Sequence, residues 1–197
     1  MPDRLPLLDR PRLRGERVTL REPRESDIDD RLRYPIDPEE EDAYGSAWRR
    51  EWDGRLHHTR EYLAAGPDQP DEPGTYSWVV EHDGRSIGGA RLEVDADQHG
   101  AEYSVGLFVP GLRGQGLGQE ITRLVLSWGF GELRLHRVEL QVLADNGRAI
   151  RCYLACGFRQ EGVRREAGLY PDGWRDFIMM SVLRSEYDRP GAVRPAG

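Results

Sequence analysis

The sequence predicts a single mixed α/β domain built on a mostly antiparallel sheet. Three observations support this prediction. Several segments alternate apolar and polar residues, short turns join neighbouring segments of this kind into hairpins, and two later segments have the apolar spacing of amphipathic helices. A chain of 197 residues is long enough to bury one sizeable core. We expect six to seven strands with helices flanking the sheet.

The domain is expected to cover residues 13–187. Residues 1–12 are rich in proline and arginine and lack periodicity, which predicts a flexible N-terminal arm. Residues 188–197 are expected to form a polar C-terminal tail. Inside the domain, residues 35–74 give the weakest pattern and contain an acidic run, Glu39–Asp42. The sequence shows no internal repeat.

The first part of the domain is expected to hold a strand, a short helix and a hairpin. Residues 17–23 alternate as a strand does, and the polar segment after them predicts a short helix that Pro35 limits. Residues 75–95 read as two strands joined at Asp83-Gly84, which is a strong hairpin signal.

The second part is expected to hold the two longer helices. Residues 101–109 predict a strand that leads directly into a glycine-rich loop, and the apolar residues after that loop fall on one helical face. Residues 137–144 predict the next strand. Asp145 or Asn146 is expected to cap the second helix and Gly157 to end it, before a closing hairpin.

Composition and charge argue against several classes of protein. The net charge of -7 and the isoelectric point near 5.3 argue against general binding to nucleic acid. No window is apolar enough for a membrane span and no signal peptide is visible, so we expect no membrane contact and a cytoplasmic location. The only cysteines, Cys152 and Cys156, lie four positions apart and are interpreted as buried thiols, not metal ligands.

The stretch VPGLRGQGLGQEI, residues 109–121, lies between a strand and a helix. Its glycines Gly114, Gly116 and Gly118 let backbone N–H groups turn inward, and the positive end of the helix faces the same place. This combination predicts an anion site suited to phosphate. A Walker A loop needs a lysine, which the chain lacks, and a dinucleotide fingerprint needs G-x-G-x-x-G within parallel βαβ units.

The loop fits the pattern Arg/Gln-x-x-Gly-x-Gly/Ala, and at this point the sequence resembles the GCN5-related N-acetyltransferase superfamily. The segment NGRAIRCYLACGF is similar to the family's second cofactor helix. Its matches are Asn146, Ala149, Tyr153, Gly157 and Phe158. The segments RLRGERVTLREPRESDIDD and DGWRDFIMMSVLRSEY resemble the subgroup that includes ribosomal-protein N-terminal acetyltransferases and spermidine acetyltransferases.

This resemblance implies a strongly bent sheet in which two neighbouring strands splay apart and form a cleft for acetyl-CoA. It implies that the loop amides bind the pyrophosphate and that the strand edge before the loop pairs with pantetheine, where one main-chain N–H would polarise the thioester carbonyl. No metal is implied. The residues expected to contact acetyl-CoA are Leu107, Phe108, Val109, Arg113, Gly114, Gln115, Gly116, Leu117, Gly118, Asn146 and Tyr153.

Acetyl transfer to an amine requires a neutral nucleophile, a stabilised oxyanion and a protonated leaving thiol. Tyr153 matches the family tyrosine that protonates the thiolate; its other interpretation is a core aromatic. Asn146 is a cofactor contact, a helix N-cap or both. Glu102 is the candidate general base, directly or through water, because strand alternation places it on a polar face, although that face fits solvent equally well. Glu93 on the adjacent strand is the reserve candidate.

The expected function is therefore transfer of an acetyl group from acetyl-CoA to a primary amine. Two acceptors remain open. The subgroup resemblance favours a protein N-terminus, and the acidic run at residues 39–42 favours a small amine such as a polyamine or an aminoglycoside. The alternative function is a non-catalytic acyl-CoA sensor or interaction module on the same fold. Many relatives are dimers, and a homodimer stays open for this chain.

Overall fold

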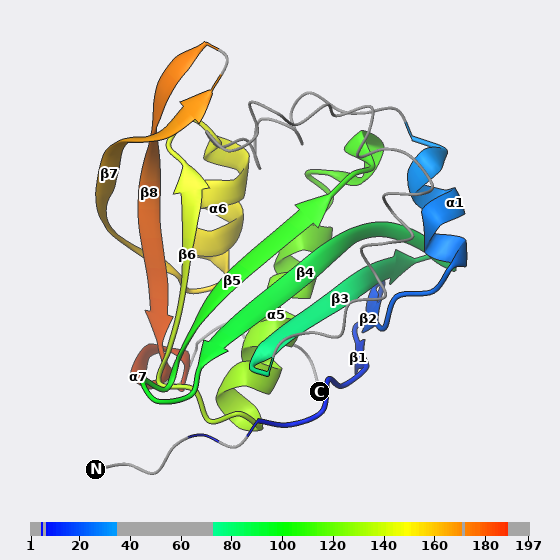
Figure 1. Ribbon diagram of the computed structural model, residues 1–197, viewed down its shortest axis with the longest axis horizontal. Coiled ribbons are helices and arrows are strands. Elements are labelled where there is room, and N and C mark those ends of the chain that lie inside the picture. Colours follow the sequence, from blue (N-terminus) through cyan, green and yellow to red (C-terminus); the bar gives the residue numbers. More distant parts are fainter. Residues whose placement is uncertain (1–4, 6, 35–72, 171, 189–197) are drawn as a thin grey trace.

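The computed structural model describes residues 5, 7–34, 73–170 and 172–188, and within them one sheet of eight strands organises the chain (Figure 1). The strands, in sheet order, are β1 (Leu13–Arg14), β2 (Thr19–Arg21), β3 (Thr75–His82), β4 (Arg85–Asp95), β5 (Gly100–Leu107), β6 (Arg137–Leu143), β8 (Gly173–Leu183) and β7 (Arg159–Tyr170). The helices are α1 (Ser26–Leu32), α5 (Leu117–Gly131), α6 (Gly147–Ala155) and α7 (Arg184–Tyr187), with a 3-10 turn at Pro110–Leu112.

The sheet confirms the predicted mixed α/β class and the mostly antiparallel pairing. Among its neighbouring pairs only β5 and β6 are parallel. The sheet has eight strands, whereas six to seven were expected. The additional strand is β1, whose two residues, Leu13 and Arg14, are too few to show an alternating pattern. The predicted hairpin turn at Asp83-Gly84 is present, with both residues at positive φ.

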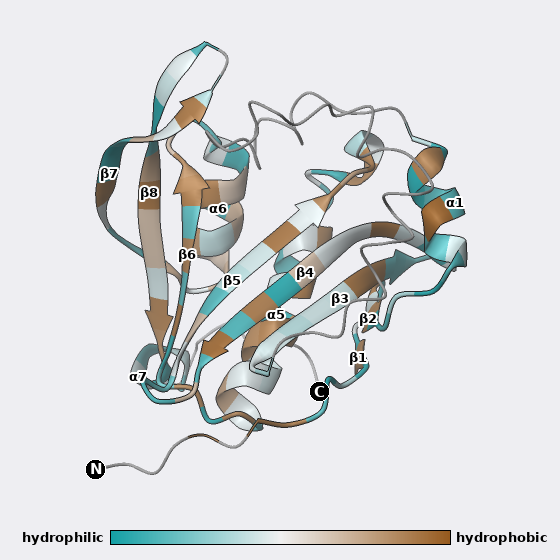
Figure 2. Ribbon diagram, in the orientation of Figure 1, coloured by the Kyte–Doolittle hydropathy of each residue, from teal (hydrophilic) through white to brown (hydrophobic). Residues whose placement is uncertain are grey.

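Helix α5 packs against one face of β3 and β4 and supplies much of the core. Trp128 on α5 meets the rings of Tyr76 and Trp78 edge-on, at centroid distances of 4.7 Å and 5.5 Å. Figure 1 shows α5 behind these strands, and Figure 2 shows the alternation of polar and apolar residues along β4 that this one-sided packing requires. No helix in the described ranges is long and apolar enough to span a membrane.

Strands β5 and β6 separate soon after they meet, as the sequence resemblance implied. Their parallel pairing runs only from Gly100 to Glu102 on β5 and from Arg137 to Glu139 on β6. Beyond that point β5 stays paired with β4 up to Leu107, and β6 stays paired with β8. Figure 1 shows the two halves of the sheet diverging. Within the described residues, the facing edges of β5 and β6 therefore lack a strand partner beyond these three residue pairs.

The described part of the N-terminal segment is held against the sheet, where the sequence predicts a flexible arm. Leu5 donates to Ala96 O, the Leu8 amide donates to the Tyr76 hydroxyl, and the Trp78 indole donates to Pro11 O at 2.7 Å. Groups distant in sequence make these bonds, so the segment's own composition does not reveal them. Residues 35–72, including the acidic run Glu39–Asp42, lie outside the described residues.

A buried ion pair joins β2 to the start of α1. Arg21 is only 4% exposed, and its guanidinium donates two hydrogen bonds to the Asp27 carboxylate, at 2.9 Å and 2.6 Å. Glu81 accepts a third at 2.5 Å. The hydrogen bond to Asp27 is the largest of the influences that raise the pKa of Arg21. The pair fixes α1 against the sheet at a point that hydrophobic packing alone would not specify.

Removing one member of this pair should cost stability. We expect Asp27→Asn to lower the free energy of unfolding by about 3 kcal/mol, because it leaves a buried guanidinium incompletely neutralised. Urea denaturation at neutral pH measures the change. The matched control is Glu93→Gln, which breaks an ion pair with Arg91 whose members are 50% and 54% exposed; its cost should stay below about 1 kcal/mol. Equal costs for the two variants would contradict the structural role of Asp27.

Candidate active site

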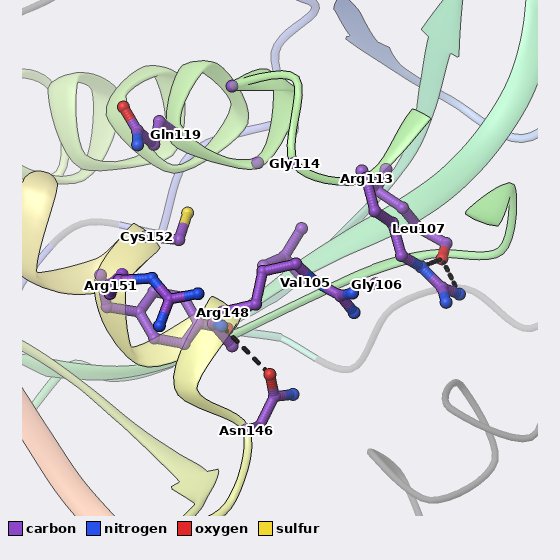
Figure 3. A pocket seen from close by; sticks show the side chains of 14 residues that line it. Val105, Gly106, Leu107, Arg113, Gly114, Gln119, Asn146, Arg148, Arg151 and Cys152 are labelled. Atoms are coloured by element: carbon purple, nitrogen blue, oxygen red, sulfur yellow. Dashed lines mark hydrogen bonds between the residues drawn. The ribbon is translucent and has the colours of Figure 1, made fainter. Parts of the chain in front are cut away.

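A cavity of about 330 Å³ lies beside the separation of β5 and β6, enclosed by the end of β5, the glycine loop and α6 (Figure 3). That volume suits part of a small-molecule ligand. The lining residues are Val105, Gly106, Leu107, Arg113, Gly114, Gly116, Gly118, Gln119, Asn146, Arg148, Ala149, Arg151, Cys152 and Tyr153. The two motifs that the sequence singled out, the glycine loop and α6, therefore line one cavity.

The glycine loop owes its shape to two left-handed residues. Gly114 has a φ of +77° and Gly116 has a φ of +84°, a region that other residues enter only with strain. Gly116 is the N-cap of α5, so the first amides of α5 lie at the cavity wall. A Cβ atom on Gly114 would meet nothing within 4 Å, which leaves room for a ligand to approach the backbone. These features fit the predicted anion site.

Arg113 has a structural task that the sequence did not reveal. Its Nε and Nη2 donate to Leu107 O at 3.0 Å and 2.6 Å. The guanidinium therefore caps the last carbonyl of β5 and fastens the strand end to the loop, as the dashed lines in Figure 3 show. Its charge still lies at the cavity, because Arg113 is one of the lining residues.

The pairing of β5 with β4 determines which backbone groups face the separation of the strands. The Phe108 amide donates to Ile87 O at 3.0 Å, so this residue faces β4. Because strand residues alternate in direction, the main-chain groups of Val105 and Leu107 point the other way, toward the unpaired edge. Leu107 O is occupied by Arg113, whereas the Val105 and Leu107 amides are directed at the cavity side.

Helix α6 contributes both residues that the sequence placed on it. Asn146 is the N-cap, and its Oδ1 accepts a hydrogen bond from the Ala149 amide at 3.1 Å. It also lines the cavity, so capping and ligand contact are compatible. Tyr153 is 8% exposed, packs its ring 5.8 Å from that of Phe158, and still reaches the cavity wall. The Tyr153 side chain therefore belongs to the core and also lines the cavity, so the two interpretations of this residue are compatible.

Glu102 lies outside this cavity, on the opposite face of β5 from the buried Tyr103. It stands directly across from Glu93 on β4 and from Glu139 on β6, so three carboxylates form a row over adjacent strands. Partial burial raises the pKa of Glu102, and the charges of Glu93 and Glu139 raise it further. A carboxylate with a raised pKa beside the separation of the strands can accept a proton through a water molecule.

The structure divides the predicted cofactor residues into two groups. Those on the cavity wall are Leu107, Arg113, Gly114, Gly116, Gly118, Asn146 and Tyr153. Phe108, Val109 and Leu117 are not on that wall and have buried side chains, and the Gln115 side chain donates to Gly111 O. Their backbone groups remain part of the strand end and loop.

The sequence did not single out Arg148, Arg151 or Cys152 as cavity residues, although they surround Asn146 and Tyr153 on α6. Ala149 was matched there only as part of the second motif, and Cys152, interpreted as a buried thiol, is partly exposed and lines the cavity. Helical spacing could have found some of them, because residues 149 and 153 share a face and residues 148 and 152 share the next one. In the described ranges, no group of three or more His, Cys, Asp or Glu residues is arranged to hold a metal ion.

Comparisons with known proteins agree with this geometry. A family model for the acetyltransferase (GNAT) domain matches residues 17–159, which is well over half of the chain. The chain belongs to the GNAT acetyltransferase family. This membership accounts for both motifs, since the match extends over the glycine loop and α6.

Individual relatives are more distant. The chain is 30% identical to the spermidine N(1)-acetyltransferase of Escherichia coli K12 over 111 residues, covering 56% of this chain and 59% of that protein. It is 28% identical to the Vibrio cholerae spermidine N(1)-acetyltransferase over 96 residues, covering 49% and 55%. The matches thus span little more than half the length of these curated relatives. Mycobacterium smegmatis RimJ in complex with CoA-disulfide shares the fold, with a TM-score of 0.74, 20% identity, and coverage of 92% of this chain and 90% of that one.

The left-handed N-cap of α5 gives a test of the loop geometry. We expect Gly116→Ala to destabilise the chain by about 1 kcal/mol, because alanine at this φ is strained. Gly111→Ala is the matched control in the same loop, since Gly111 has no positive φ and a Cβ there would meet nothing within 4 Å. Thermal or urea denaturation of both variants checks the difference. Indistinguishable stabilities would mean that the loop does not need the left-handed residue.

Proposed function

We propose that this chain is an N-acetyltransferase that uses acetyl-CoA to acetylate a primary amine. One observation carries the proposal beyond family membership: the cavity is lined by Arg113, Arg148 and Arg151 and by no carboxylate among its described lining residues, although the whole chain carries a net charge of -7. A positive cavity in an acidic protein selects an anionic ligand. The phosphates of CoA have that character.

The residues present fit acetyl-CoA. The first amides of α5 and the backbone of Gly114 and Gly116 would hold the pyrophosphate, because they combine open N–H groups with the positive end of a helix. Arg148 and Arg151 would add charge to the phosphate end of the cavity. The unpaired edge of β5 would hold the pantetheine arm, as a strand would be held. When bound, acetyl-CoA supplies the activated thioester.

The chain's own residues supply the remaining chemistry. The Leu107 amide, directed at the unpaired edge, is placed to donate to a developing oxyanion. Tyr153 lines the cavity, and its hydroxyl would supply the proton that a leaving thiolate takes. Glu102, on the other face of β5, would take a proton from the acceptor ammonium through water. Placing base and acid on opposite sides of β5 lets an amine enter from one face and the thiol leave on the other.

The acceptor is proposed to be a small polycationic amine in preference to a protein N-terminus. Two observations support this choice: the curated relatives above are spermidine acetyltransferases, and the row of Glu93, Glu102 and Glu139 would attract cations to the face of the sheet where Glu102 lies. The row is flanked by Arg91 and Arg137, which hold Glu93 and Glu139 in ion pairs. Among the described residues, Glu102 therefore has the weakest neutralisation of the three.

Activity can be tested directly. We expect the chain to release free CoA from acetyl-CoA and to acetylate one member of a panel containing spermidine, an aminoglycoside and a short peptide with a free N-terminus. Tyr153→Phe should lower kcat by about 10- to 100-fold, because the general acid is lost. Tyr187→Phe is the matched control, since Tyr187 is equally buried at 8% exposure but packs on Phe130 instead of lining the cavity.

The outcomes of this assay separate the possible functions. CoA release that tracks acetylated amine, with the loss confined to Tyr153→Phe, supports the proposal. Binding of acetyl-CoA without turnover on any amine would contradict it and favour the non-catalytic sensor.

The pH dependence tests Glu102 as the base. Glu93 raises the pKa of Glu102, so removing that charge should lower the pKa. The base form then persists to lower pH, and we expect Glu93→Gln to move the acidic limb of kcat/KM toward lower pH. Glu132→Gln, in an exposed position after α5, should leave the profile unchanged. A shift in the opposite direction, or an unchanged limb in Glu93→Gln, would exclude Glu102 as the titrating base.

A further inference from the structure

The cavity contains a second kind of chemistry that acetyl transfer does not use. Cys152 and Cys156 lie one turn apart on α6, and only Cys152 is a lining residue. Figure 3 shows the Cys152 sulfur pointing from α6 toward α5. Cys156 is buried at 2% exposure, with its sulfur 3.6 Å from Gln119 O. The pair thus has one member that a ligand in the cavity can reach and one that it cannot.

The Cys152 sulfur sits at the positive end of α5. A Cβ atom placed on Gly118, the second residue of α5, would lie 3.4 Å from this sulfur. Anions are stabilised at such a helix end, and thiols there ionise more readily. The positive N-terminal end of α5, which the cavity offers to a phosphate, therefore also favours a thiolate at Cys152.

A partly buried arginine strengthens this environment. Arg123, on α5, donates through Nη2 to Gln119 Oε1 at 3.1 Å and to Ala155 O at 3.4 Å, so its guanidinium crosses from α5 to the end of α6. Its Nε is buried without a hydrogen-bond partner in the described part of the chain. An incompletely satisfied cation beside two thiols favours a negative charge on one of them.

The two thiols differ in acidity for identifiable reasons. A hydrogen bond from Cys156 lowers the pKa of Cys152, with a further lowering by Arg123, while burial opposes both. The same hydrogen bond and burial raise the pKa of Cys156. The single thiol proton of Cys156 can point to Gln119 O or to Cys152, and ionisation of Cys152 draws it to the thiolate. Cys152 is then the nucleophile and Cys156 the donor that stabilises it.

We propose that Cys152 is a site of reversible S-thiolation by low-molecular-weight disulfides and that the adduct closes the cavity. In this step the Cys152 thiolate attacks one sulfur of R–S–S–R, a new Cys152–S–S–R bond forms, and the second sulfur leaves as R–S⁻ with the electron pair of the broken bond. A free thiol reverses the reaction by the same route. The disulfide is the oxidant, and no other co-reactant is required.

The second half of this proposal, closure of the cavity, rests on the proposed function. A tripeptide-sized adduct at Cys152 would occupy space in a cavity of about 330 Å³, next to the loop glycines. Acetyl-CoA and the adduct should therefore exclude each other. Reaction at Cys152 itself needs no cofactor and can be measured alone.

The test uses the full chain, glutathione disulfide as the probe, and intact mass with peptide mapping as the readout, at a series of pH values. We expect one glutathione per native chain, on Cys152, with a rate whose pH midpoint lies below that of an unfolded control in urea. Cys152→Ser should form no adduct. The midpoint is the informative quantity, because a thiolate of lower pKa is also intrinsically a weaker nucleophile.

Substitutions of the neighbours test the mechanism of activation. Cys156→Ala removes the donor and should raise the pH midpoint at Cys152, whereas Cys156→Ser keeps a hydroxyl donor and should restore it toward the wild-type value. Arg123→Gln should also raise the midpoint. An adduct on Cys156, no adduct on the native chain, or a midpoint equal to that of the unfolded control would overturn the proposal.

Competition between acetyl-CoA and the adduct tests the thiol proposal and the placement of the cofactor separately. Saturating acetyl-CoA should slow the modification of Cys152 at least tenfold, and glutathionylated chain should lose binding of acetyl-CoA until a reductant restores it. Suppose that the adduct forms, but acetyl-CoA does not protect Cys152 and the glutathionylated chain still binds acetyl-CoA. Closure of the cavity and the placement of the cofactor are then overturned, while the assignment of Cys152 as the reactive thiol stands. If acetyl-CoA binds but no adduct forms, only the thiol proposal is overturned.

Discussion

The separation of β5 from β6 is the constraint on which the rest of the structure depends. Three residue pairs join the two strands, and after Glu102 and Glu139 each strand is paired, in the part of the chain that the structure describes, only with its outer neighbour. A sheet with unpaired edges in its interior is costly unless something else satisfies those backbone groups. Arg113 satisfies one of them at Leu107 O. The remaining groups on that edge give the cavity a wall that can pair with an extended ligand.

The same separation explains the electrostatic character of the site. The chain is acidic overall, but the side of β5 that faces α5 and α6 gathers three arginines and the start of a helix, whereas the other side carries a row of glutamates. An anionic cofactor and a cationic acceptor are thereby drawn to opposite sides of one strand. The thiol pair on α6 belongs to the positive side, because the field that suits a phosphate also suits a thiolate.

Much of this arrangement could be predicted from local patterns. The glycines of the loop, the N-cap Asn146 and the hairpin at Asp83-Gly84 are local signals, and each is present in the structure. The loop and α6 could be related to one site only through the family resemblance. The sequence does not encode locally the bond from Arg113 to Leu107, the anchoring of Pro11 by Trp78, or the convergence of Arg148 and Arg151, because these contacts depend on how distant elements pack.

We infer that the cavity beside the separated strands binds acetyl-CoA. The thermal midpoint of unfolding, measured with and without acetyl-CoA or free CoA, tests this inference most directly. At about one hundred times the dissociation constant, a ligand that binds only the folded state stabilises it by about 2.7 kcal/mol, which corresponds to about 5–10 °C for a chain of this size. We expect such a rise with both ligands. An unchanged midpoint at saturating concentrations of both would contradict this inference.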